Sequence, residues 1–260
     1  MIDRHERLVT NATTRLSAES PWLVVSAVPV RPASVEFGAA SGDELRRWMR
    51  QQVAVWPAPI ITGSDQPETR ADSLTFAPQR PPGQPVKGYY CQLNADGSAL
   101  GALQVGTLRD SPADGTPVWA VGEGAVAWIT IALLRLTAAY ADHATVLGDA
   151  AVELTLTSPT AADRTAPIEV WNHNTQTYAP AGTHRIADVE PRRHTVDLAT
   201  CLSPDLARAA RPLVLDLLRQ FGLSESRHID ASGVIQRSNF TGYAEAILAW
   251  TDAIGVPSQP

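Results

Sequence analysis

One glycine-rich turn in this sequence, Gly122-Glu123-Gly124, has the residue types and spacing of a phosphate-binding site. It follows a predicted strand and opens a long apolar helix, and residues 122–127 fit the G-x-G-x-x-A pattern of dinucleotide-binding turns. Glu123 would place a carboxylate beside the phosphates, the helix is longer than a typical crossover, and the next predicted strand supplies no acid for a ribose hydroxyl. We therefore expect Gly122 and Gly124 to serve the turn rather than a cofactor, and Glu123 to complement the positive helix N-terminus. No cofactor is expected.

The histidines and cysteines show no spacing typical of a metal site. The histidines form no HxH, HExxH or HxxxH pair, and no cysteine lies near one of them in the sequence. Cys91 and Cys201 are too few for a disulfide framework, so we expect free, buried thiols and no metal. The histidines are His5, His143, His173, His184, His194 and His228.

No nucleophile motif points to catalysis, because neither a G-x-S-x-G elbow nor a P-loop occurs. We therefore predict no catalytic residue and favour a protein that is not an enzyme. The alternative is an enzyme whose site is assembled from residues far apart in the sequence, because such sites leave little trace in it. The candidates for that site are His143, His173 or His194 with Asp142 or Asp188.

The one basic cluster, Arg192-Arg193-His194, is the candidate site for a ligand or an acidic partner. It follows Glu190 and precedes a predicted strand, so a solvated strand end is the favoured interpretation. The formal net charge of −6 argues against a broad nucleic-acid interface, whose footprint is normally basic. Weak nucleic-acid binding through Arg192 and Arg193 is the third functional alternative, and it would be strongly salt-dependent.

The longest apolar segment predicts a central helix at about residues 123–147, on which the rest of the fold packs. Serine, aspartate and proline at residues 203–205 are a strong helix start, and Pro212 is expected to kink or split the helix that follows. The last helix is expected to bury Tyr243, Ile247 and Trp250. The other predicted helices cover about residues 2–17, 41–56, 203–221 and 240–254.

Alternating or continuous apolar runs predict short strands, most of them joined by hairpins rather than crossovers. Hairpins favour an α+β fold with a mostly antiparallel sheet packed on the central helix. A loop at residues 109–117 divides the chain into an N-terminal lobe, 1–108, and a C-terminal lobe, 117–260, or lies within one continuous domain. A turn is expected at 171–174 and a small hairpin at 228–235. The predicted strands are 22–30, 73–77, 89–93, 99–105, 117–121, 151–157, 168–171 and 194–198.

Several stretches together resemble a known family. They are SPWLVV at residues 20–25, TPVWAV at 116–121 with the apolar helix after it, LVLDLLRQFG at 213–222 and DASGVIQR at 230–237. They are similar to the region that follows the Schlafen/AlbA-type DNA-binding domain in actinobacterial proteins, which are usually labelled ATP-binding proteins or transcriptional regulators. The resemblance covers about residues 5–254 without that domain, so it implies an accessory or regulatory module, and the DNA- and nucleotide-binding labels are not carried over.

The composition, 44% hydrophobic and 18% charged, is that of an ordinary globular domain. The first nine residues carry charges where a signal peptide needs an apolar run, and Arg135 interrupts the longest apolar run before membrane-spanning length. We therefore expect a cytoplasmic, non-enzymatic sensor or accessory module that acts with a partner protein.

Overall fold

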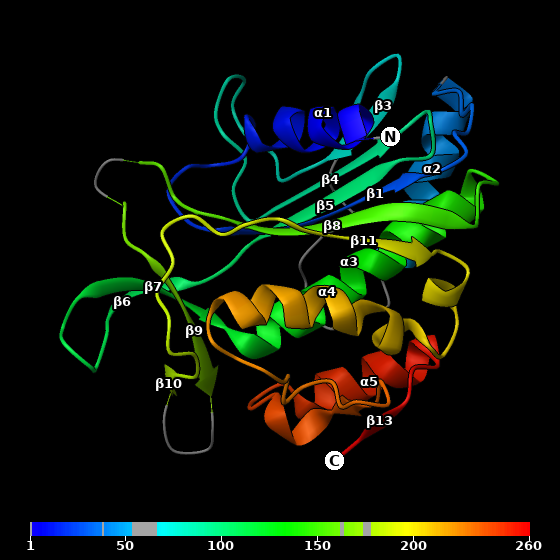
Figure 1. Cartoon of the computed structure of the whole chain (residues 1–260). Helices are drawn as coiled ribbons and strands as arrows, with labels where there is room; N and C mark the ends of the chain where they lie inside the picture. Colours follow the sequence, from blue (N-terminus) through cyan, green and yellow to red (C-terminus); the bar gives the residue numbers. More distant parts are fainter. Residues whose placement is uncertain (1, 38, 54–66, 162–163, 174–177) are drawn as a thin grey trace.

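The computed structural model describes residues 2–37, 39–53, 67–161, 164–173 and 178–260. Its centre is a seven-stranded antiparallel sheet in the order β11-β8-β1-β5-β4-β3-β2 (Figure 1). These strands are β1 (Trp22–Pro29), β2 (Glu68–Thr69), β3 (Ser73–Phe76), β4 (Tyr89–Asn94), β5 (Ala99–Gln104), β8 (Asp149–Thr157) and β11 (Arg192–Asp197).

Helices cover both faces of this sheet, which explains why β1 is apolar at almost every position. Trp22 and Val24 pack toward α1 (Ile2–Thr13), whereas Leu23 and Val25 pack toward α3 (Glu123–His143). Successive side chains of a strand point to opposite faces, so a strand buried on both sides reads as a continuous apolar run. Figure 1 shows α1 on one side of the sheet and α3 on the other.

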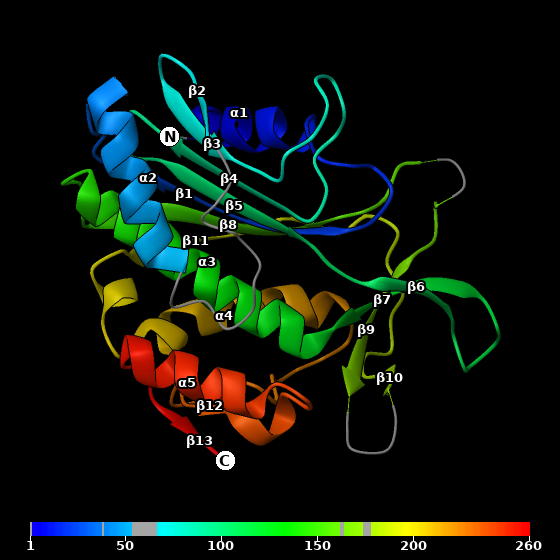
Figure 2. The same cartoon turned by 180° about the vertical axis from the view of Figure 1, so that it is seen from behind.

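The central helix α3 is the packing centre, as predicted, but it ends at His143 rather than near residue 147. Of the described helices it is the one long and apolar enough to cross a membrane, yet 83% of its most apolar window is buried inside the protein. It lies so close to β5 that a side chain at Gly101 would collide with Leu133. α2 (Ala39–Val53), α4 (Leu206–Gln220) and α5 (Ala244–Ile254) lie on the same side of the large sheet as α3 (Figure 2).

A second, four-stranded sheet extends from the N-terminal end of α3. Its order is β10-β9-β7-β6, in which β7 and β9 are parallel and the other pairs are antiparallel. A short parallel pair joins β12 (Ile235–Gln236) to β13 (Ser258–Gln259). The strands of the second sheet are β6 (Thr107–Asp110), β7 (Pro117–Gly122), β9 (Ile168–His173) and β10 (Tyr178–Pro180).

The α+β class with mostly antiparallel sheets on a long central helix is confirmed. Strands from both sides of residues 109–117 share the large sheet, and that segment is the end of a β6–β7 hairpin rather than a loop throughout. The turn predicted at 171–174 is wrong for 171–173, which continue β9, while residue 174 lies outside the described residues. The hairpin at 228–235 is reduced to one bridge, Ile229 with Ile235.

Pro212 does not split its helix, because α4 runs unbroken around it. Proline removes one N–H, which would have bonded to the carbonyl of Arg208. Leu213 and Leu217 are fully buried and hold the helix against the core. Packing therefore outweighs the local cost of the proline.

Candidate functional site

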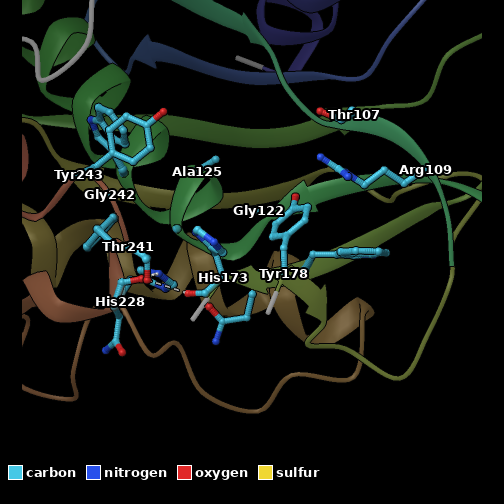
Figure 3. A pocket seen from close by; sticks show the side chains of 16 residues that line it. Thr107, Arg109, Gly122, Ala125, His173, Tyr178, His228, Thr241, Gly242 and Tyr243 are labelled. Carbon is cyan, nitrogen blue, oxygen red and sulfur yellow. Dashed lines mark hydrogen bonds between the residues drawn. The ribbon is translucent and has the colours of Figure 1, made fainter. Parts of the chain in front are cut away.

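A cavity of about 820 Å³ opens at the N-terminal end of α3 (Figure 3). Its lining comes from β6, the β7–α3 turn, β9, β10, and the segments around residues 228 and 239–243. A volume of this size falls within the range of ordinary small-molecule sites. We call this cavity the aromatic cleft, because five of its lining side chains are aromatic: Trp128, Trp171, Tyr178, Phe240 and Tyr243.

The aromatic side chains of the cleft form pairs across different elements. The rings of Trp128 in α3 and Tyr243 before α5 have centroids 5.6 Å apart, and those of Trp171 in β9 and Tyr178 in β10 are 4.9 Å apart. Figure 3 shows Tyr243 on one side of the cleft and Tyr178 on the other. The two pairs together provide flat apolar surfaces facing a solvent-accessible space, which is the usual basis for binding planar apolar groups.

The prediction that Tyr243 is buried is wrong, since 54% of its surface is exposed. α5 begins at Ala244, so Tyr243 precedes the helix. It is therefore not on the helix face that carries the buried residues Ile247 and Trp250. A large exposed aromatic side chain beside a cavity is more informative than a buried one, because it leaves apolar surface available for a ligand.

The lining of the cleft holds the positive charge of Arg109. Arg109, His173 and His228 line it, and among the residues that the structure describes no aspartate or glutamate does. The guanidinium carbon of Arg109 lies 5.3 Å from the ring centroid of Tyr178, a cation–π geometry. Among the residues that the structure describes, no carboxylate forms an ion pair with Arg109. Its charge is therefore open to an incoming anion.

Glu123 is buried and contacts the segment that forms one wall of the cleft. Its Oε1 accepts a hydrogen bond of 2.8 Å from the backbone N–H of Arg227 and lies 3.3 Å from Nδ1 of His228. Burial raises the pKa of Glu123, but the hydrogen bond and charge of His228 and the N–H of Arg227 outweigh it and hold that pKa below its usual value. Glu123 therefore lies at the N-terminus of α3 and also connects this helix to Arg227 and His228.

Both ring nitrogens of His228 face protein groups: Nε2 is hydrogen-bonded, whereas Nδ1 is buried against Glu123 without a hydrogen-bond partner among the described residues. Its Nε2 lies 3.0 Å from the carbonyl oxygen of Asn239, and its Nδ1 faces Glu123. A catalytic base needs a nitrogen within hydrogen-bond reach of the reacting group. We therefore assign Glu123 and His228 a positioning role beneath the cleft.

The two glycines of the opening turn have different environments. A Cβ at Gly124 would lie 2.8 Å from Nε2 of His228, whereas the nearest atom to a Cβ at Gly122 is 3.8 Å away. Gly124 is therefore required for the close approach of His228 to α3. The strand that follows α3, β8, lies in a different sheet from β7, so this turn is not part of the βαβ unit of a dinucleotide fold.

The predicted basic cluster does not converge on one ligand position. Arg192 pairs with Glu190 at 3.2 Å, and His194 lies 2.8 Å from Asp216 of α4. Arg193 points to the other side of β11, where it pairs with Glu153 of β8. Successive side chains of a strand point to opposite faces of the sheet, so these three residues do not share one face although they are adjacent in the sequence.

Of the five residues proposed for a dispersed catalytic site, His173 alone lines the aromatic cleft. His143 lies near the opposite end of α3, with its ring centroid 5.3 Å from that of Trp48, and His194 is engaged by Asp216. Within the described residues no group of three or more histidine, cysteine, aspartate or glutamate side chains is arranged to hold a metal ion.

A second polar cluster is buried between α1 and the large sheet. Nε2 of His5 lies 3.0 Å from Oγ of Ser26 and 3.4 Å from Oε2 of Glu153. A serine–histidine–acid triad uses the two ring nitrogens separately, whereas here one nitrogen meets both partners. Burial, with a smaller contribution from the charge of Arg193, lowers the pKa of His5 to about 4. The cluster is a buried polar network rather than a catalytic one.

Sequence reasoning identified the turn at Gly122 but not the cleft that it borders. The aromatic residues that line the cleft are separated along the chain, and the exposure of Tyr243 arises only from the folded arrangement. The usable signal was the number of tryptophan and tyrosine residues near predicted strand and helix ends. Comparisons of the chain with protein-family models, with curated proteins and with solved structures found no match.

Proposed function

We propose that this protein is a cytoplasmic, non-enzymatic sensor module that binds a small aromatic ligand in the aromatic cleft and acts through a partner protein. The observation that carries the proposal is the gathering of two aromatic pairs, Trp128 with Tyr243 and Trp171 with Tyr178, around one open cavity. Aromatic side chains supply a large contact area at low conformational cost, which favours recognition of flat ligands.

The chemistry of the lining supports binding rather than catalysis. Nε2 of His228 is hydrogen-bonded to the carbonyl of Asn239 and its buried Nδ1 faces Glu123, while Glu123 contacts Arg227 and His228 without lining the cavity. The arginines of β11 are paired with carboxylates, which makes them poor candidates for a nucleic-acid interface. The resemblance to the region that follows the Schlafen/AlbA-type domain implies an accessory or regulatory module, which is compatible with this proposal.

A ligand can influence a partner because the cleft joins separate parts of the fold. Tyr243 precedes α5, Tyr178 belongs to β10 of the second sheet, and Trp128 belongs to the central helix. A flat molecule between these side chains would favour one arrangement of α5 relative to the second sheet. A partner that contacts both elements would then have different affinities for the free and the bound protein.

The proposal is tested with N-phenyl-1-naphthylamine, a neutral aromatic probe whose fluorescence rises in apolar surroundings. We expect saturable binding to the intact chain, weakened at least tenfold in Tyr243→Ala and in Ala125→Phe, which fills the cleft from α3. Leu248→Ala is the matched control, because Leu248 is an exposed apolar residue of α5 that does not line the cleft.

Circular dichroism melting curves establish that each variant is folded before its affinity is compared. Absence of saturable probe binding to the intact chain would overturn the proposal. So would equal loss of affinity in Leu248→Ala and Tyr243→Ala, because the binding surface would then lie elsewhere on α5.

A further inference from the structure

We infer that the ligand of the aromatic cleft is a planar aromatic anion, in which a ring carries one carboxylate, sulfonate or phosphate group. This inference rests on the proposed function and adds the charge of the ligand to it. It follows from three features of the described residues: an arginine without an ion-pair partner, a lining without acidic residues, and aromatic surfaces next to that arginine.

The charge of the cleft differs from that of the chain. The protein carries a formal net charge of −6, yet the ionisable lining residues besides the tyrosines are Arg109, His173 and His228. The nearest carboxylate of the site, Glu123, is buried against Arg227 and His228 and does not line the cavity. A pocket that holds the charge of Arg109, with no carboxylate among its described lining residues, attracts anions and disfavours cations.

Arg109 is the anchor for the anionic group. It lies on the exposed strand β6, and no ion pair among the described residues uses its guanidinium. A guanidinium has a planar fork of donors that matches two oxygens of a carboxylate, sulfonate or phosphate. Figure 3 shows Arg109 beside Tyr178 at one side of the cleft.

The position of Arg109 fixes where the ring of the ligand lies. Its guanidinium carbon is 5.3 Å from the Tyr178 ring centroid, which in turn is 4.9 Å from that of Trp171. An anion held by Arg109 therefore places an attached ring within reach of this aromatic pair.

The test compares two probes that share one ring system. 1-Anilinonaphthalene-8-sulfonate is N-phenyl-1-naphthylamine with an added sulfonate, so the difference in their affinities reports on the charge alone. We expect the sulfonate probe to bind the intact chain about tenfold more tightly at low salt, as for one charge-assisted contact. The affinity of this probe should fall with increasing salt, and that of the neutral probe should not.

Arg109→Gln should remove most of the preference for the sulfonate, measured as the ratio of the affinities of the two probes for the same variant. Arg109→Lys keeps the charge and should retain part of the preference. Arg31→Gln is the matched control: Arg31 is exposed and lines a separate small cavity near Leu147, at the opposite end of α3, about 30 Å away along the helix.

The outcomes separate the two proposals. If the neutral probe binds in the cleft but the sulfonate probe binds no more tightly, the inference about charge is wrong and the sensor proposal stands. The inference is also wrong if Arg31→Gln removes the preference as effectively as Arg109→Gln. If neither probe binds saturably, both proposals fall.

Discussion

Nδ1 of His228 lies 3.3 Å from Oε1 of Glu123, and both side chains are buried beneath the aromatic cleft. The contact joins the first residue of α3 to the segment that leads to Phe240 and Tyr243. Asn239 adds a second link, since its carbonyl oxygen faces Nε2 of the same histidine. The pair therefore sets the position of one wall of the cleft relative to the central helix.

Removing the Glu123 carboxylate should be costly. In Glu123→Ala we expect the free energy of unfolding to fall by about 3–5 kcal/mol, because His228 loses its partner in a buried site and the Arg227 N–H loses its acceptor. Glu123→Gln keeps an acceptor oxygen and should lose less. Urea denaturation measures both.

The control for this experiment is Glu225→Ala, which removes an exposed carboxylate paired with Arg211. Its cost should stay below about 1 kcal/mol, since exposed ion pairs contribute little. Equal losses in Glu123→Ala and Glu225→Ala would contradict the structural role assigned to the buried pair.

The two glycines of the opening turn should respond differently to alanine. Gly124→Ala places a Cβ 2.8 Å from Nε2 of His228 and should destabilise the protein by about 1–3 kcal/mol, despite the higher helix propensity of alanine. Gly122→Ala meets nothing closer than 3.8 Å at a φ of −68° and should change stability by less than about 1 kcal/mol. Thermal melting of the two variants side by side checks the difference, and the reverse order would be incompatible with this packing.

Acid should destabilise the protein through His5. The pKa of His5 falls from 6.5 to about 4 on folding, so between these values the unfolded state binds the extra proton and the folded state does not. Above pH 6.5 both states are neutral at this residue and its full contribution is present. As pH falls from 6.5 through 4 that contribution is lost, up to on the order of 3 kcal/mol.

The measurement is the free energy of unfolding in urea at a series of pH values from 7 to 4. His5→Gln should flatten the curve in this window, whereas the control His184→Gln, at an exposed histidine, should leave its slope unchanged. A wild-type slope that survives in His5→Gln would assign the acid sensitivity to other groups.

The contact between β5 and α3 should appear as coupling between two substitutions. Gly101→Ala forces a methyl group into the side chain of Leu133, and we expect a loss of about 1–3 kcal/mol. Leu133→Ala creates space at that position, so the double variant should lose less than the sum of the single losses, by about 1 kcal/mol or more. Combining Gly101→Ala with Leu218→Ala of α4 should instead give an additive loss, as measured by urea denaturation.

The helices and strands that could be predicted are those determined by local sequence patterns. The run at residues 22–30 matched a strand buried on both faces, and the apolar segment from Glu123 matched the central helix. The strands predicted at residues 89–93 and 99–105 also form, as β4 and β5, and they pair as a hairpin with Gly97 at a φ of +82° in its turn. In each of these cases, burial periodicity or turn chemistry within about thirty residues determines the structure.

The candidate site could not be predicted in the same way, because tertiary packing alone brings it together. Arg109, Trp128, Trp171 and Tyr243 come from four separate elements, and no local pattern reports that they share a cavity. Pro212 is a second case in which packing outweighs local sequence. Proline predicts a break in the helix, but buried leucines keep α4 continuous through it. In the basic cluster of β11, residues that are adjacent in the sequence contact carboxylates on opposite faces of the strand, which their adjacency does not reveal.

The paired side chains of β11 also bear on its position at the edge of the large sheet. β11 is an outermost strand of the large sheet, and Arg192, Arg193 and His194 along it are each held by a carboxylate. A strand from another molecule that tried to add to this edge would have to desolvate or break those ion pairs. At the other edge, β2 has two residues and is too short to act as a template. Both edges of the sheet thus resist the intermolecular strand pairing that leads to aggregation.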